Sequence, residues 1–146
     1  IPIFSCTALQ AIALQATLVN QTYISVIPSK KGFLYVQLFN RERSGSLVDV
    51  SESLYLSISE FFNLIAKFKV PINLIGILDE TTKSELENQE NISFFETYIS
   101  CKTIHSYVIN CLKHKTESEF KQIKPFYFHE PNIGIIKKKN SKFKTN

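Results

Sequence analysis

Two cysteines and two histidines in the second half of the chain are the residues with the most potential as metal ligands. They form a C-x3-H-x5-C-x2-H run, and thiolate and imidazole are ligands that zinc prefers. The spacing matches no familiar zinc module, and four ligands packed this closely would strain the chain. We therefore expect core cysteines, surface histidines, no bound metal and no other cofactor. The four residues are Cys101, His105, Cys111 and His114.

Catalytic groups are sparse elsewhere as well. A nucleophile pair drawn from the same cysteines and histidines has no neighbouring group to orient the base and no oxyanion donors. Asp79 and Glu80 open an acidic segment that runs to Glu96, in which Lys83 is the single cation. Such a segment is typical of a solvated loop or helix end. The sequence therefore predicts a protein that is not an enzyme.

Basic and aromatic residues cluster around one strand-like segment, residues 33–39. Two lysines precede it and two arginines follow it, and its aromatic residues fall on one face because successive strand residues alternate in direction. A positive groove with aromatic faces grips single-stranded nucleic acid. The alternative is that the rest of the chain covers this face too. The predicted nucleic-acid-binding residues are Lys30, Lys31, Phe33, Tyr35, Phe39, Arg41 and Arg43, with Lys137, Lys138 and Lys139 near the C-terminus.

Positive charge is concentrated at the C-terminal end. The net charge is +4, and residues 113–146 hold nine lysines against three glutamates. We expect residues 1–136 to form a single α+β domain and residues 137–146 to form a disordered basic tail. Such an arm is attracted to nucleic acid or an acidic partner, with a solubilising tail as the alternative.

Composition limits the classes that remain. A chain of 146 residues with 44% hydrophobic and 21% charged residues is typical of one globular domain. No apolar run reaches the roughly 18 residues of a membrane span, so we expect no membrane partner. Three cysteines indicate no disulfide framework and favour an intracellular location.

The periodicity predicts an α+β fold, in which a capped amphipathic helix packs on a twisted antiparallel sheet. Ser57 and Glu60 form a capping box, and the helix that follows has one apolar face. That face consists of Phe61, Leu64, Ile65 and Phe68. We expect another helix at residues 7–19, strands at 23–27, 33–39, 47–50, 54–56, 72–78, 92–99, 126–128 and 133–136, and either a strand or a helix at 103–112.

Residues 22–69 carry a series of short motifs. In order these are Tyr23-Ile24-Ser25-Val26, Lys31-Gly32, a strand through Phe39, a turn at Gly45, and Leu54-Tyr55-Leu56-Ser57 entering the capped helix. This order resembles the positive-cofactor-four family of transcriptional coactivators, which bind single-stranded DNA. The resemblance implies a twisted antiparallel sheet with a terminal helix.

The resemblance also bears on individual residues. Phe61 and Leu64 match a buried aromatic residue and a leucine of the family's helix, and Lys31 matches a basic position beside the turn glycine. Phe33 and Phe39 stand where that family has basic residues. The residues Arg41 and Arg43 lie close to its basic and aromatic positions but out of register.

We therefore expect a single-stranded-DNA-binding accessory factor of transcription or replication, without catalytic activity and located in the nucleus. A homodimer or a protein partner is left open. One alternative is a sliding-clamp-like module, because a strand, a helix, three strands and a capped helix also resemble one clamp repeat. The other is a protein–protein adaptor that docks through the aromatic face.

Overall fold

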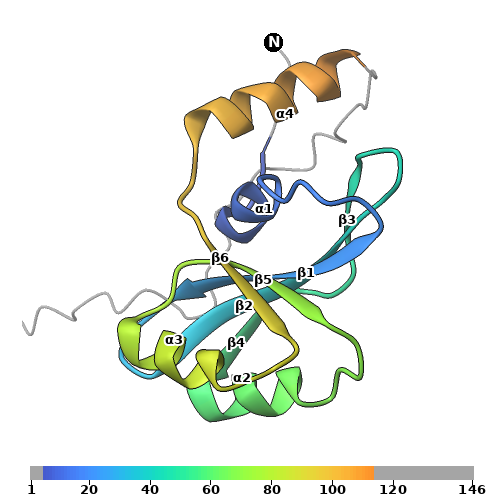
Figure 1. Cartoon of the computed structure of the whole chain (residues 1–146). Coiled ribbons are helices and arrows are strands. Elements are labelled where there is room, and N and C mark those ends of the chain that lie inside the picture. The colour runs from blue at the N-terminus through green and yellow to red at the C-terminus, as the bar shows by residue number, and fades with distance from the viewer. Residues whose placement is uncertain (1–4, 114–146) are drawn as a thin grey trace, which may run out of the picture.

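The structure is a computed structural model and describes residues 5–113. These residues form both helices and a sheet, so the predicted α+β class is confirmed (Figure 1). The elements are α1 (Ala8–Ala13), β1 (Gln21–Pro28), β2 (Phe33–Arg41), β3 (Leu47–Asp49), β4 (Leu54–Ser57), α2 (Ile58–Ile65), β5 (Ile72–Gly76), α3 (Glu80–Glu87), β6 (Ile92–Glu96) and α4 (Cys101–Lys113).

One mixed sheet organises the described residues. Its strand order is β3-β2-β1-β5-β6, and β4 pairs with the same edge of β2 as β3 does. The pairs among β1 to β4 are antiparallel, as the sequence predicts. β5 and β6 extend the sheet with parallel pairs, because helices α2 and α3 return the chain to the same end before each strand.

The antiparallel half is built from local signals. A turn that includes Gly32, with φ of 81°, joins β1 to β2, so that Tyr23 lies opposite Phe39 and Ile27 opposite Tyr35. The predicted capping box begins α2: the Ser57 main-chain N–H donates to the Glu60 carboxylate at 2.8 Å, and the Glu60 N–H donates to the Ser57 hydroxyl at 3.3 Å.

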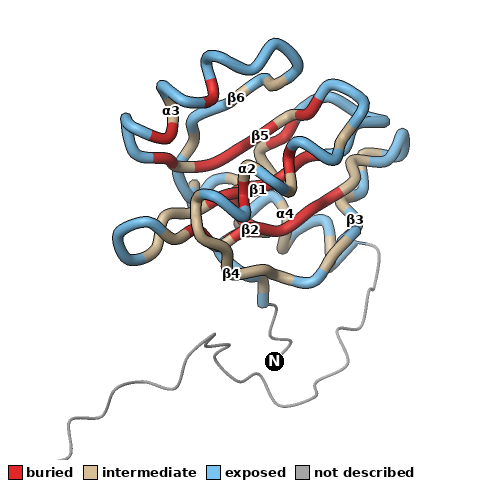
Figure 2. Tube along the Cα trace, turned by 90° about the horizontal axis from the view of Figure 1, so that it is seen from below, coloured by how far each residue is buried: buried red, intermediate tan, exposed pale blue. Residues whose placement is uncertain are grey.

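The two faces of the sheet are covered by different helices (Figures 1 and 2). α2 and α3 lie on one face, where Phe61 and Ile65 pack against the aliphatic residues of β1, β2 and β5. Leu64 and Phe68 are half-buried at the border of this core, so the predicted apolar face of the helix is the packed one. α1 lies on the opposite face, with α4 beyond it.

Three segments differ from or refine the predicted elements. The first helix is shorter than residues 7–19: α1 ends at Ala13, and beyond it the Leu18 N–H donates to the Tyr23 hydroxyl at 3.0 Å. In the acidic segment, predicted as a solvated loop or helix end, residues 80–87 form helix α3, and β6 confirms the predicted strand at 92–99 over a shorter range. Residues 101–113 form a helix, one of the two predicted alternatives.

Several predictions fall on residues outside the described range. These are the strands at 126–128 and 133–136, the domain end at residue 136, the basic tail 137–146 with Lys137, Lys138 and Lys139, and His114. Among the described helices, none has the length and apolar character to cross a membrane.

Candidate nucleic-acid interface

Three aromatic rings form a continuous row on β2 and β4. The antiparallel register places Tyr35 of β2 opposite Tyr55 of β4 and puts Phe33 on the same face. The Phe33 and Tyr55 rings are stacked, with centroids 5.1 Å apart and an interplanar angle of 6°. Tyr35 contacts the same Tyr55 ring at 5.1 Å with a 45° tilt. All three residues of the aromatic row are half-buried.

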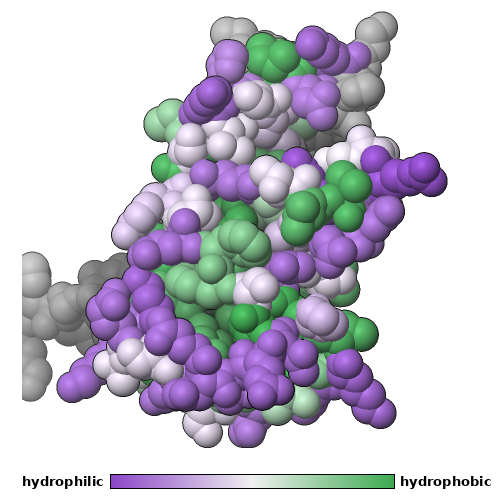
Figure 3. All heavy atoms as spheres, in the orientation of Figure 1, coloured by the Kyte–Doolittle hydropathy of each residue, from purple (hydrophilic) through white to green (hydrophobic). Residues whose placement is uncertain are grey.

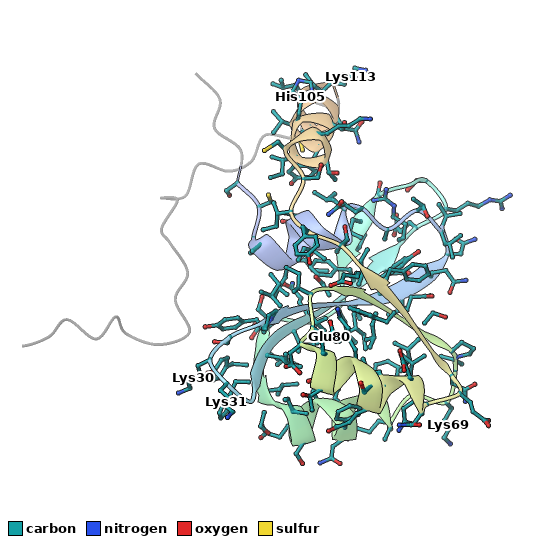
Figure 4. All side chains as sticks on the ribbon, turned by 60° about the vertical axis from the view of Figure 1, so that its left-hand side comes forward. Lys30, Lys31, Lys69, Glu80, His105 and Lys113 are labelled. Atoms are coloured by element: carbon teal, nitrogen blue, oxygen red, sulfur yellow. The ribbon has the colours of Figure 1, made fainter. Side chains whose placement is uncertain are left out.

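Two exposed lysines lie at one end of the aromatic row. Lys30 and Lys31 occupy the turn between β1 and β2, and Figure 4 shows both projecting away from the body of the molecule. The Lys30 ammonium lies 5.3 Å from the centroid of the Phe33 ring. A cation beside an aromatic ring places a phosphate-binding group next to a base-stacking surface. The structure thus brings together Lys30, Lys31, Phe33 and Tyr35 of the predicted site.

The prediction that Phe39 belongs to the interface is wrong. Its side chain is fully buried, because α1 crosses this end of the sheet and packs Leu9 and Ala13 against the ring. Gln37 on the same face is also buried, with its amide donating to the Ser51 carbonyl oxygen at 3.1 Å. The aromatic face of β2 is therefore covered at its C-terminal half, while at its N-terminal half Phe33 and Tyr35 are half-buried.

The two arginines do not share a groove with the two lysines. Arg41 ends the nine-residue strand β2, roughly 26 Å from Phe33 at about 3.3 Å per residue. Arg43 is exposed in the following turn, at the same far end. The buried Phe39 lies between the two pairs on the aromatic face, so no continuous stacking surface links them.

The described residues carry almost no net charge. Residues 5–113 hold nine lysines and arginines against ten aspartates and glutamates. Within this range, any attraction of a phosphate would therefore depend on local groups such as Lys30 and Lys31 rather than on the net charge. The predicted contacts Lys137, Lys138 and Lys139 lie outside the described residues.

The acidic residues at the start of α3 have structural partners. The Asp79 carboxylate caps the helix by accepting the Thr82 N–H at 2.9 Å. The Lys83 ammonium bridges Glu80 at 2.8 Å and Glu96 at 2.9 Å. These hydrogen bonds raise the pKa of Lys83 and lower that of Glu96.

Cys101, His105 and Cys111 of the zinc pattern lie along α4. Cys101 is exposed and Cys111 half-buried, so the prediction of core cysteines is wrong, while His105 is exposed as predicted. Within residues 5–113, no three His, Cys, Asp or Glu side chains gather as a metal site. Cys111 instead neighbours Tyr107, whose pKa rises to about 12, mainly through burial and then through its hydrogen bond with Cys111. The absence of zinc from the protein stays a prediction.

The residue that the sequence did not single out is Tyr55. It stands in a four-residue strand between two leucines, a pattern that predicts a strand and no more. Tyr55 belongs to the aromatic row because it lies opposite Tyr35, and that pairing depends on the register between β4 and β2. The available signal was a second tyrosine at a strand position in a later β-segment, β4.

No protein-family model and no curated protein matches this sequence.

Proposed function

We propose that this chain binds single-stranded nucleic acid, with DNA favoured, at the end of the sheet that carries the aromatic row. Its role would be that of a non-catalytic accessory factor in transcription or replication, in the nucleus. The observation that supports the proposal best is the continuous contact from Lys30 to Phe33, Tyr55 and Tyr35. An ammonium for a phosphate and rings for bases are the two components of sequence-tolerant single-strand binding.

The geometry limits the length of the bound segment. α1 closes the aromatic face before Phe39, so the accessible platform is confined to the first half of β2 and to β4. Such a platform suits a few nucleotides, and the lysines of the β1–β2 turn would hold their phosphates. A strand longer than this would leave the platform and depend on other cations, among them Lys137, Lys138 and Lys139.

A pair of tyrosine substitutions tests the stacking. Binding of a fluorescein-labelled oligo-dT 15-mer and of a duplex of equal length is followed by anisotropy. We expect Tyr55→Ala to weaken single-strand binding by about 5- to 150-fold, since stacking contributes roughly 1–3 kcal/mol per base. Tyr98→Ala is the matched control, because Tyr98 is 63% exposed and follows β6, apart from the aromatic row.

Two outcomes would contradict the proposal. One is equal affinity of the two tyrosine variants for oligo-dT while both remain folded by circular dichroism. The other is a wild-type dissociation constant above about 10 µM for either probe at moderate salt, the range of nonspecific attraction. Preference for duplex by an oligomeric form of the chain would favour the clamp-like alternative instead.

A further inference from the structure

Strand β6 forms one edge of the sheet. Among the described residues it pairs only with β5. The Ile72 N–H donates to the Asn91 carbonyl oxygen at 2.9 Å, and the Thr97 N–H donates to the Gly76 carbonyl oxygen at 2.9 Å. Alternate residues of a parallel strand bond to the same neighbour, so residues 91, 93, 95 and 97 face β5. The main-chain groups of Ile92, Phe94 and Glu96 therefore point away from the sheet.

Exposed apolar side chains accompany this edge. Phe95 on β6 is 47% exposed, and Tyr98 and Ile99 directly after it are 63% and 48% exposed. Figure 3, in the orientation in which β6 lies in front, shows hydrophobic surface in the middle of this side framed by hydrophilic side chains. Long exposed edges with apolar residues are templates for pairing with another strand.

The charge around the edge has one sign. Helix α3 and the loop to β6 expose Glu85, Glu87 and Glu90, and Glu96 ends the strand. The one cation of this segment, Lys83, is already bonded to Glu80 and Glu96. A second copy of this chain would bring the same acidic residues together across the new pair, and like charges oppose such an association.

We propose that the outer edge of β6 binds an extended peptide segment of a partner protein that carries lysine or arginine side chains. The segment adds to the sheet as a further strand, with main-chain hydrogen bonds to Ile92, Phe94 and Glu96. Its apolar residues cover Phe95, and its cations lie beside the glutamates of α3. This surface is separate from the aromatic row, which lies on β2 and β4.

A proline substitution tests the main-chain pairing. Glu96→Pro removes an outward N–H without touching the ladder to β5, since proline is tolerated where the N–H of an edge strand faces solvent. Glu96→Gln is the matched control, because it loses the same charge and the same ion pair with Lys83. Both full-length variants are checked by circular dichroism and thermal unfolding.

The probe is a fluorescein-labelled octapeptide of alternating lysine and valine, with its anisotropy measured against the full chain. We expect Glu96→Pro to bind it about tenfold more weakly than Glu96→Gln, corresponding to one lost main-chain hydrogen bond. The same peptide, N-methylated at every second amide along its pairing edge, should bind the wild-type chain as weakly as the unmethylated peptide binds Glu96→Pro.

Three results would overturn the proposal. The first is equal binding of the proline and glutamine variants, and the second is equal binding of the methylated and unmethylated peptides. The third is a wild-type dimer in sedimentation that Glu96→Pro converts to a monomer, which would assign the edge to a second copy.

Discussion

Gly76 of β5 lies opposite Val26 of β1, where an added Cβ atom has no room, so substituting Gly76 should cost more stability than substituting Gly32 or Gly45. Its φ is 142°, a conformation almost restricted to glycine. A Cβ atom added there would meet the Val26 carbonyl oxygen. That oxygen accepts the Ile77 N–H at 3.1 Å, so it is held in place by the chain on both sides.

The expected magnitude follows from two separate costs. Backbone strain at such a φ costs about 1–3 kcal/mol, and forcing an extra carbon into packed surroundings costs about 1–3 kcal/mol more. Gly76→Ala should therefore lower the free energy of unfolding by about 4 kcal/mol, a large part of the roughly 5–15 kcal/mol of a typical domain.

Gly45→Ala is the control that separates the two costs. Gly45 also has a positive φ, 87°, but an added Cβ would meet nothing within 4 Å. Gly45→Ala should therefore add only backbone strain and lower the free energy of unfolding by about 1–2 kcal/mol. Urea unfolding with both m-values compared gives the two free energies. If Gly76→Ala were no more destabilising than Gly45→Ala, the close approach of β5 to β1 would be wrong.

Three further expectations concern the helices. Phe61→Ala should lower the free energy of unfolding by about 3–5 kcal/mol, since the ring is fully buried under the sheet, and a loss under 1 kcal/mol in urea unfolding would contradict this. Hydrogen bonds from Ser57 lower the pKa of Glu60, so the stability from the cap is present above the ordinary glutamate pKa and lost as the pH falls through the lowered value. The stability difference between wild type and Glu60→Gln should then shrink in acid, and a difference independent of pH would refute the cap. Burial raises the pKa of Tyr107 to about 12. The neutral Tyr107 side chain therefore stabilises the fold fully below pH 10, and this stabilisation is lost as the pH rises through 12. Ultraviolet titration should show a late tyrosine ionisation step, and Tyr107→Phe should remove that step.

Local signals predicted the antiparallel half of the fold well. The capping box and the apolar face of α2 are encoded within a dozen residues, and the β1–β2 hairpin by a turn between two β-rich segments. The parallel half depends on where two crossover helices return the chain. That placement depends on contacts between distant segments, and no short motif in the sequence encodes such contacts.

Only part of the candidate site could be predicted from the sequence, because some of its residues are placed by local signals and others by tertiary contacts. Strand alternation places Phe33 and Tyr35 on one face, and the turn lysines are adjacent in sequence. The burial of Phe39 depends on α1 crossing the sheet, and the contribution of Tyr55 depends on β4 pairing with β2. Both are tertiary contacts, which alternation within a single strand does not specify.

The central claim is that nucleic acid binds at the Lys30/Lys31 end of the sheet, and the salt dependence of binding tests it most directly. Oligo-dT affinity is measured from low to moderate salt for K30A/K31A and for K67A/K69A, whose two exposed lysines follow α2; Figure 4 shows Lys69 on the opposite side of the molecule. Each phosphate contact contributes a log–log slope of about −0.7 for single strands. K30A/K31A should therefore flatten the slope by about 1.4 and weaken binding to all sequences alike, while K67A/K69A leaves the slope unchanged. Equal slopes for the two double variants would contradict the account.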